Sequence, residues 1–192
     1  MKAEEETRKG IEKAVNFIKR GGVVIFPTDT VYGFIADAGN KKAVENIFRI
    51  KKRSRKKPLA VFVKNIEAAK QLAEINNKQE KILKQYWPGR FTFVLKRKKI
   101  NKKLYGLDKS SLALRVPNYK PLNDLLRKIN KPLVQTSVNV SGKKPLNKVK
   151  EIITQFKNSK IPIILINAGD LKNPKPSQII DLTKTKNRLI RR

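Results

Sequence analysis

Two loops rich in hydroxyl and amide side chains directly follow apolar segments of the sequence. PTDT (27–30) comes after VVIF, and TSVNVSG (136–142) comes after PLVQ. If the apolar segments are strands of an open α/β sheet, both loops lie at its carboxyl edge, where such sheets bind ligands. A single loop of this kind is more commonly a turn or a helix cap. Two of them, with the basic segments described next, favour a site that holds a polar ligand.

Basic side chains occur where they could neutralise an anion. The segment KKRSRKKPL (51–59) suits a polyphosphate, although a solvated charged turn has the same composition. It lacks the GxxxxGK[ST] pattern of a Walker loop. Arg115 lies in the otherwise apolar segment SLALRV, and a buried arginine requires a carboxylate or phosphate partner. That partner is either a ligand or an acidic side chain, and the chain has 15 acidic residues for 46 basic ones.

The composition excludes several kinds of chemistry. The chain has no histidine and no cysteine, which rules out Ser-His-Asp and Cys-His catalysis, disulfides, and thiolate or imidazole metal sites. The net charge of +31 predicts an anionic partner such as a nucleotide, phosphate or RNA. A genome biased towards Lys, Asn and Ile codons would produce a similar charge. The charged start MKAEEETRKG and the lack of long apolar runs lead us to expect a cytoplasmic protein with no membrane segment.

Apolar periodicity predicts the elements that position these side chains. Helices are expected near 4–20, 41–51, 65–74, 78–86, 119–129 and 147–157. Strands are expected near 23–26, 59–63, 91–96, 111–116, 132–137, 161–166, 177–182 and 188–192. VVIF has no polar alternation, so we expect it to be buried on both faces. Because strands and helices interleave without a break in composition, we predict a single α/β domain over residues 1–192.

Six segments, taken in order, resemble the YrdC/TsaC family of threonylcarbamoyl-AMP synthases. They are PTDTVYGF, KKRSRKKPL, WPGRFTFVL, SLALRVP, TSVNVSGKKP and PSQIIDL. The resemblance runs from about residue 11 to residue 191 and corresponds to the short, single-domain form of the family. It implies a twisted mixed sheet flanked by helices, with a large basic cavity. It also implies a nucleotidyltransferase that converts L-threonine, bicarbonate and ATP to L-threonylcarbamoyl-AMP and pyrophosphate for a tRNA modification.

The resemblance also assigns residues to a site. Its ATP-binding positions are Lys51, Arg53, Lys57, Ser111, Ser137, Asn139 and Arg191. Its threonine-binding positions are Thr30, Tyr32, Arg115 and Ser177. It implies no covalent nucleophile, so catalysis would rest on positioning and charge neutralisation. It implies no metal ligand from the protein, and Mg²⁺ would be held mainly by the ATP phosphates. Some family members have a histidine where this chain has Phe62.

The implied partners are ATP, L-threonine, bicarbonate and a downstream tRNA threonylcarbamoyl transferase, with direct tRNA or RNA binding as a further expectation. A second class of function stays open at this point: a non-catalytic RNA-binding or ribosome-assembly protein that uses the same basic cavity. The sequence has no RNP-type aromatic pattern and only 7% aromatic residues, so platforms for base stacking are few. A direct assay for the adenylate product distinguishes the two classes.

Overall fold

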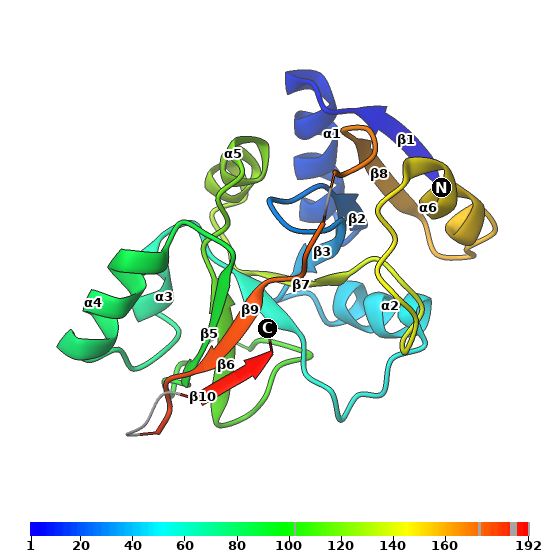
Figure 1. The fold of residues 1–192 in the computed structure, drawn as a ribbon. Helices are drawn as coiled ribbons and strands as arrows, with labels where there is room; N and C mark the ends of the chain where they lie inside the picture. The colour runs from blue at the N-terminus through cyan, green and yellow to red at the C-terminus, as the bar shows by residue number, and fades with distance from the viewer. Residues whose placement is uncertain (102, 173, 185–187, 192) are drawn as a thin grey trace.

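One ten-stranded mixed sheet forms the centre of the computed structural model, which describes residues 1–101, 103–172, 174–184 and 188–191 (Figure 1). The strand order is β1-β8-β2-β3-β7-β4-β6-β5-β9-β10. The strands are β1 (Lys2–Glu5), β2 (Val23–Phe26), β3 (Gly33–Asp37), β4 (Ala60–Phe62), β5 (Phe91–Lys96), β6 (Ser111–Arg115), β7 (Leu133–Ser137), β8 (Ile163–Asn167), β9 (Gln178–Asp181) and β10 (Arg188–Arg191). The pairs β1–β8, β2–β8, β4–β6 and β5–β9 are parallel, and the other neighbouring pairs are antiparallel. The predicted mixed α/β fold is confirmed.

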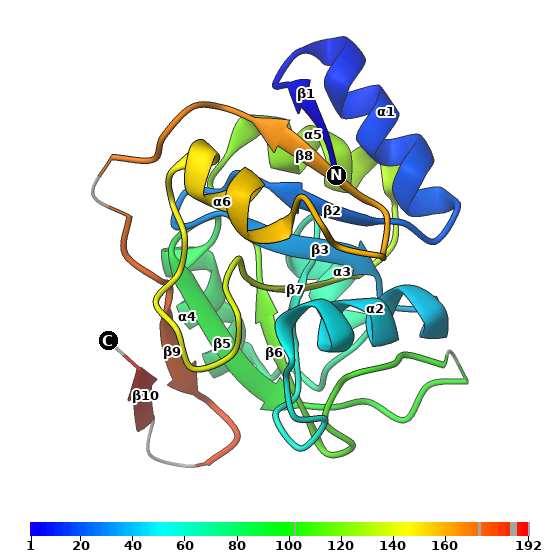
Figure 2. The same ribbon diagram turned by 90° about the vertical axis from the view of Figure 1, so that its right-hand side faces the viewer.

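Helices cover both faces of this sheet. They are α1 (Arg8–Lys19), α2 (Lys41–Lys51), α3 (Ile66–Lys70), α4 (Asn77–Tyr86), α5 (Lys120–Ile129) and α6 (Val149–Phe156). All four residues of β2 are buried, as expected, and successive side chains enter different cores. Val24 and Phe26 pack in the apolar cluster with α1 and α5. Val23 and Ile25 pack in the larger cluster with α2 and α6, which lie in front of the sheet in Figure 2.

The N-terminal helix predicted over residues 4–20 is wrong in its first turn. Residues Lys2–Glu5 instead form β1, which pairs in parallel with β8 at the edge of the sheet. The helix begins at Arg8, because the Thr7 hydroxyl accepts a hydrogen bond from the backbone N–H of Gly10 at 3.2 Å and so caps its first turn. The apolar spacing starts only at Ile11 and could not define this boundary.

Residues Gly33–Asp37 form β3, a central strand that periodicity did not predict. All five of its residues are buried, and it is antiparallel to both β2 and β7. β2 and β7 therefore run in the same direction, and their carboxyl ends lie at the same edge of the sheet. This arrangement brings the PTDT and TSVNVSG loops together, as the sequence predicted.

Other boundaries differ from the predictions by a few residues. α3 ends at Lys70, short of the predicted residue 74, because Ala73 forms a β-bridge with Arg97 and the backbone of Glu74 bonds to Lys96. Within the parts of the chain that the structure describes, no helix is both long enough and apolar enough to span a membrane.

Candidate functional site

A cavity of about 220 Å³ lies at the carboxyl ends of β2 and β7. Six residues predicted for the site line it: Thr30, Arg53, Arg115, Ser137, Ser177 and Arg191. They come from distant parts of the sequence and meet because β7, β4, β6, β5, β9 and β10 are consecutive in the sheet. The cavity is basic, since three of its lining residues are arginines and none of the described lining residues is acidic. Its volume is below the usual range for small-molecule pockets, about 300–1,000 Å³.

The PTDT loop is both a tight turn and one wall of the cavity. The Thr28 hydroxyl donates to the Val31 carbonyl at 2.7 Å and accepts from the backbone N–H groups of Thr30 and Val31. The Thr30 hydroxyl lies 2.9 Å from that of Thr28 and accepts a hydrogen bond from Arg115. The turn therefore fixes the Thr30 hydroxyl beside an arginine in the cavity wall.

Arg115 is 1% exposed and has an acidic partner that the sequence analysis did not name. Its Nη2 donates to Asp29 Oδ1 at 2.5 Å, its Nη1 to Thr30 Oγ1 at 3.0 Å, and its Nε to the Gly89 carbonyl at 3.0 Å. Phe62 contributes a cation–π contact, with the guanidinium carbon 5.7 Å from its ring centroid. Burial lowers the pKa of Arg115, and the charge of Asp29 opposes that shift. Arg115 thus has a structural ion pair and also lines the cavity.

Ser177 and Arg191 form the opposite corner of the cavity. Arg191 donates through Nε and Nη2 to the Ser177 carbonyl at 3.1 and 2.8 Å, and through Nη2 to the Ser177 hydroxyl at 3.2 Å. The Ser177 hydroxyl also lies 2.9 Å from that of Thr92, a buried cavity residue that the sequence analysis missed. A signal was present, because Thr92 alternates with Phe91 and Phe93 and is polar within an apolar strand.

The basic loop contributes one charged side chain, that of Arg53, to the cavity. Arg53 is half-buried, and burial lowers its pKa. Its Nε donates to the Lys57 carbonyl and its Nη2 to the Pro58 carbonyl, both at 2.9 Å, which holds the loop in a compact turn. The Lys57 side chain is exposed and does not line the cavity.

Lys51 is 1% exposed and is not among the residues that line the cavity, but it holds a neighbouring loop in place. Its Nζ donates to the carbonyl of Ser137, to the carbonyl of Asn139 at 3.0 Å, and to Asn139 Oδ1 at 2.7 Å. Burial lowers the pKa of Lys51 to about 7, and the positive charge of Arg53 contributes to this shift. Lys51 therefore fixes the end of β7 to the end of α2.

Asn139 likewise shapes the loop that follows β7. Its Oδ1 accepts from the Ser137 hydroxyl at 2.7 Å, and its Nδ2 donates to the carbonyls of Val140 and Lys143 at 2.9 and 2.6 Å. Gly142 has a φ of +87°, a conformation that other residues rarely adopt. Ser137 lines the cavity, whereas Asn139 is buried behind it.

Tyr32 and Ser111 lie outside the cavity lining. Tyr32 is fully buried, and its hydroxyl donates to the Gly169 carbonyl at 2.7 Å, which connects the residue before β3 to the loop after β8. Burial raises the pKa of Tyr32. Ser111 begins β6 on the same strand face as Arg115, but its hydroxyl lies 3.2 Å from Asp108 Oδ1.

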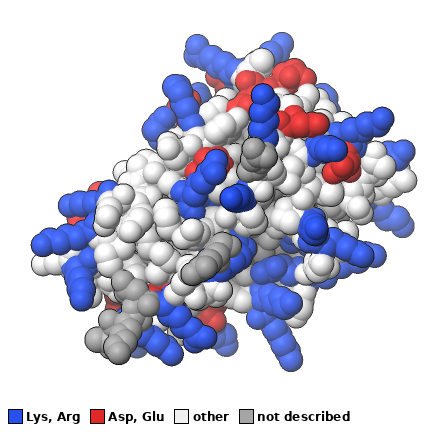
Figure 3. Space-filling view, in the orientation of Figure 1, with Lys and Arg blue, Asp and Glu red and all other residues white. Residues whose placement is uncertain are grey.

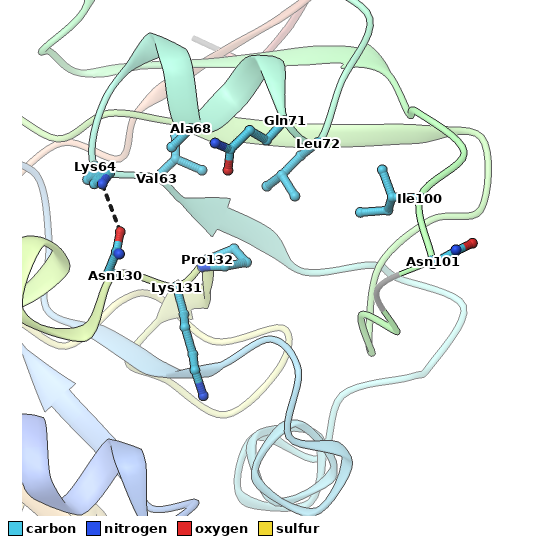
Figure 4. Close-up of a pocket in the computed structure, with 10 residues that line it drawn as sticks. All are labelled: Val63, Lys64, Ala68, Gln71, Leu72, Ile100, Asn101, Asn130, Lys131 and Pro132. Carbon is cyan, nitrogen blue, oxygen red and sulfur yellow. Dashed lines mark hydrogen bonds between the residues drawn. The ribbon is translucent and has the colours of Figure 1, made fainter.

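A second and larger cavity, of about 430 Å³, contains none of the predicted site residues among those described as lining it (Figure 4). It lies at the opposite ends of β4 and β7, where the Nζ of Lys64 donates to Asn130 Oδ1 at 2.7 Å. Its walls are Val63, Lys64, Ala68, Gln71, Leu72, Ile100, Asn101, Asn130, Lys131 and Pro132. Volume alone therefore does not identify the candidate site, whereas the convergence of arginines and hydroxyls does.

Comparison with known proteins agrees with this geometry. The family model of the Sua5, YciO and YrdC proteins, described as telomere recombination, matches residues 16–192. The threonylcarbamoyl-AMP synthase of Pyrococcus abyssi is 34% identical over 177 residues, which are 91% of this chain and 51% of that protein. The threonylcarbamoyl-AMP synthase of Blochmanniella pennsylvanica is 33% identical over 168 residues, 86% of this chain and 85% of that protein.

A solved structure gives the same result. The crystal structure of P. abyssi Sua5 complexed with L-threonine superposes with a TM-score of 0.86 at 31% identity. The match covers 99% of this chain and 56% of that one, so this chain spans little more than half the length of the P. abyssi protein. The resemblance of the six ordered motifs is thereby confirmed, and the chain belongs to the Sua5/YciO/YrdC family.

Proposed function

We propose that this protein is a threonylcarbamoyl-AMP synthase, a nucleotidyltransferase that forms L-threonylcarbamoyl-AMP and pyrophosphate from L-threonine, bicarbonate and ATP. The observation that carries the proposal is the cavity itself. Its walls include the buried Arg115, which contacts the Thr30 hydroxyl. Two further arginines, Arg53 and Arg191, line the same cavity. Such a cavity suits a carboxylate at one end and a polyphosphate at the other. Relatives named for this activity are 33% and 34% identical in sequence, and a relative complexed with L-threonine shares the fold.

The reaction needs positioning and charge neutralisation more than it needs a nucleophile. The threonine amine and bicarbonate give a carbamate with loss of water, and a carbamate oxygen then attacks the α-phosphate while pyrophosphate leaves. Arg115 would bind the threonine carboxylate. Arg53 and Arg191 would neutralise the charge that develops on the leaving pyrophosphate. Because the cavity is about 220 Å³, a nucleotide would extend from it onto the exposed loop that carries Lys57.

Mg²⁺ would enter this site with ATP. The side chains that line the cavity offer hydroxyl, amide and guanidinium groups. Mg²⁺ prefers carboxylate, phosphate and water oxygens, so it would take its ligands mainly from the ATP phosphates and from water.

The product would pass to a tRNA threonylcarbamoyl transferase in the cytoplasm, where ATP, threonine and tRNA occur together. The face drawn in Figure 3 carries Lys and Arg side chains over most of its rim, and its acidic side chains gather mainly around β1 and α1. With a net charge of +31, this surface supports weak, salt-sensitive binding of tRNA or other RNA. An enzyme can also bind RNA, so RNA binding alone would not support the alternative of a non-catalytic RNA-binding protein. That alternative would also require that the protein does not turn over its substrates.

Pyrophosphate release by the purified protein is expected to require both L-threonine and bicarbonate in addition to MgATP, because the carbamate is the attacking group. The measurement is a coupled pyrophosphate assay, with mass analysis for the adenylate, in reactions that omit one substrate at a time. Folded protein that releases no pyrophosphate in the complete mixture, but binds tRNA, would favour the non-catalytic RNA-binding function instead.

Arg53→Ala is expected to weaken MgATP binding by about 1.5–3 kcal/mol, the usual contribution of hydrogen bonds to charged groups. Arg55→Ala is the matched control, because Arg55 lies in the same loop with a 70% exposed side chain and does not line the cavity. Isothermal titration with MgATP measures both. Equal affinities for the two variants would mean that the basic loop is only a solvated turn.

A further inference from the structure

Asp29 joins three segments behind the wall of the candidate site. Its Oδ1 accepts from Arg115 Nη2 on β6, and its Oδ2 accepts from the backbone N–H of Asn118, which precedes α5, at 3.1 Å. The side chains of Arg115 and Asp29 are 2% and 8% exposed, respectively, and Asp29 does not line the cavity. The Asp29 carboxylate thus acts on the cavity through Arg115, and both of its oxygens accept hydrogen bonds.

The contacts of Arg115 leave a defined part of its guanidinium for a ligand. A guanidinium has five N–H donors. Three of them are used by Gly89, Thr30 and Asp29, through Nε, Nη1 and Nη2 respectively. One N–H on each Nη has no acceptor among the residues that the structure describes. A carboxylate in the cavity would be bound by these two donors only while the guanidinium keeps its present orientation.

We propose that Asp29 is a positioning residue that fixes the Arg115 guanidinium before substrate arrives, so that its two remaining Nη–H donors bind the carboxylate of L-threonine. This inference rests on the proposed function for its ligand. Without Asp29, the planar guanidinium would rotate about the last bonds of the side chain. Threonine binding would then have to immobilise it, and this entropic cost would reduce the affinity for threonine. Asp29 also supplies the negative charge that lets Arg115 remain buried as a cation.

Asp29→Asn tests the proposal with little change in volume. An asparagine has one acceptor oxygen, so either Arg115 or the Asn118 N–H would face its NH₂ group. We expect the KM and the Kd for L-threonine to rise about tenfold or more, while those for MgATP change less than about twofold. Asp124→Asn is the control, because Asp124 pairs with the exposed side chains of Lys120 and Arg127 on its own helix, α5. If Asp29→Asn lowered the melting temperature but left the threonine KM and Kd unchanged, Asp29 would be merely structural and the proposal would be overturned.

A second measurement does not depend on turnover, and its decisive comparison uses the wild-type protein. In the wild-type protein labelled with ¹⁵N-arginine, Arg115 is expected to give separate, slowly exchanging Nη–H resonances before L-threonine is added. Asp29→Asn should merge them, and Asp124→Asn should not. Averaged Arg115 resonances in the wild type would overturn the proposal even if Asp29→Asn failed to fold. An inactive wild type with resolved Arg115 resonances would instead count against the proposed reaction alone.

Discussion

Arg115→Lys is expected to lower the affinity for L-threonine about a hundredfold while changing the affinity for MgATP by less than about threefold. Arg115 donates from three different nitrogens to Gly89, Thr30 and Asp29, and lines the cavity at the same time. A lysine ammonium is a single point charge, so it can keep the ion pair with Asp29 only by giving up the paired donors that a carboxylate requires. The measurement is a pair of titrations on the folded variant, one with threonine and one with MgATP.

The control for this experiment is Arg127→Lys, because Arg127 lies on α5 with a 60% exposed side chain and pairs with Asp124 on the same helix. Thermal unfolding must be recorded for both variants, since breaking a buried ion pair costs about 3–5 kcal/mol. A folded Arg115→Lys protein with normal threonine affinity would remove Arg115 from the substrate site. It would leave the residue with only the structural ion pair to Asp29.

The sequence predicted the edge of the sheet where the site lies, because two polar loops follow two apolar segments. VVIF and PLVQTS are apolar segments followed by polar loops, and β2 and β7 do run in the same direction. The sequence did not predict β3, which lies between β2 and β7. Because β3 is antiparallel to both of them, β2 and β7 run in the same direction. The apolar run of β3 is only Phe34 to Ala36, which is too short for its period to be read.

The sequence could not separate residues that line the cavity from residues that support it. Lys51 and Arg53 are two positions apart in one basic loop, yet Lys51 is fully buried against Ser137 and Asn139, whereas Arg53 lines the cavity. The difference arises because α2 ends at Lys51, and the next residue, Lys52, has a φ of 49° that turns the chain. Asp29 was missed for a related reason: its role depends on Arg115, which is distant in sequence, and no local pattern reports that contact.

Lys51→Met is expected to destabilise the fold by about 2–4 kcal/mol at neutral pH, because three oxygens would each lose the hydrogen bond that Lys51 Nζ donates to them. The lost hydrogen bonds hold the loop after β7, which includes the predicted ATP-binding residue Asn139. MgATP binding should therefore weaken as well. Lys52→Met is the matched control, since Lys52 is adjacent and exposed. Urea unfolding of the three proteins at several pH values measures the effect.

The pH dependence of that difference tests the cause of the pKa shift. Burial lowers the pKa of Lys51 to about 7 in the folded protein, below the ordinary lysine value of 10.5. Between these two values the unfolded chain binds more protons than the folded one, so the wild type gains stability as the pH rises. The stability difference between wild type and Lys51→Met should therefore widen by about 2 kcal/mol from pH 7 to pH 9. Titration of the other lysines affects both proteins alike, so it does not contribute to the stability difference. A difference that stays constant over this range would mean that the three oxygen acceptors around Nζ fully offset the cost of burying the charge. Lys51 would then remain a cation in the folded protein at physiological pH.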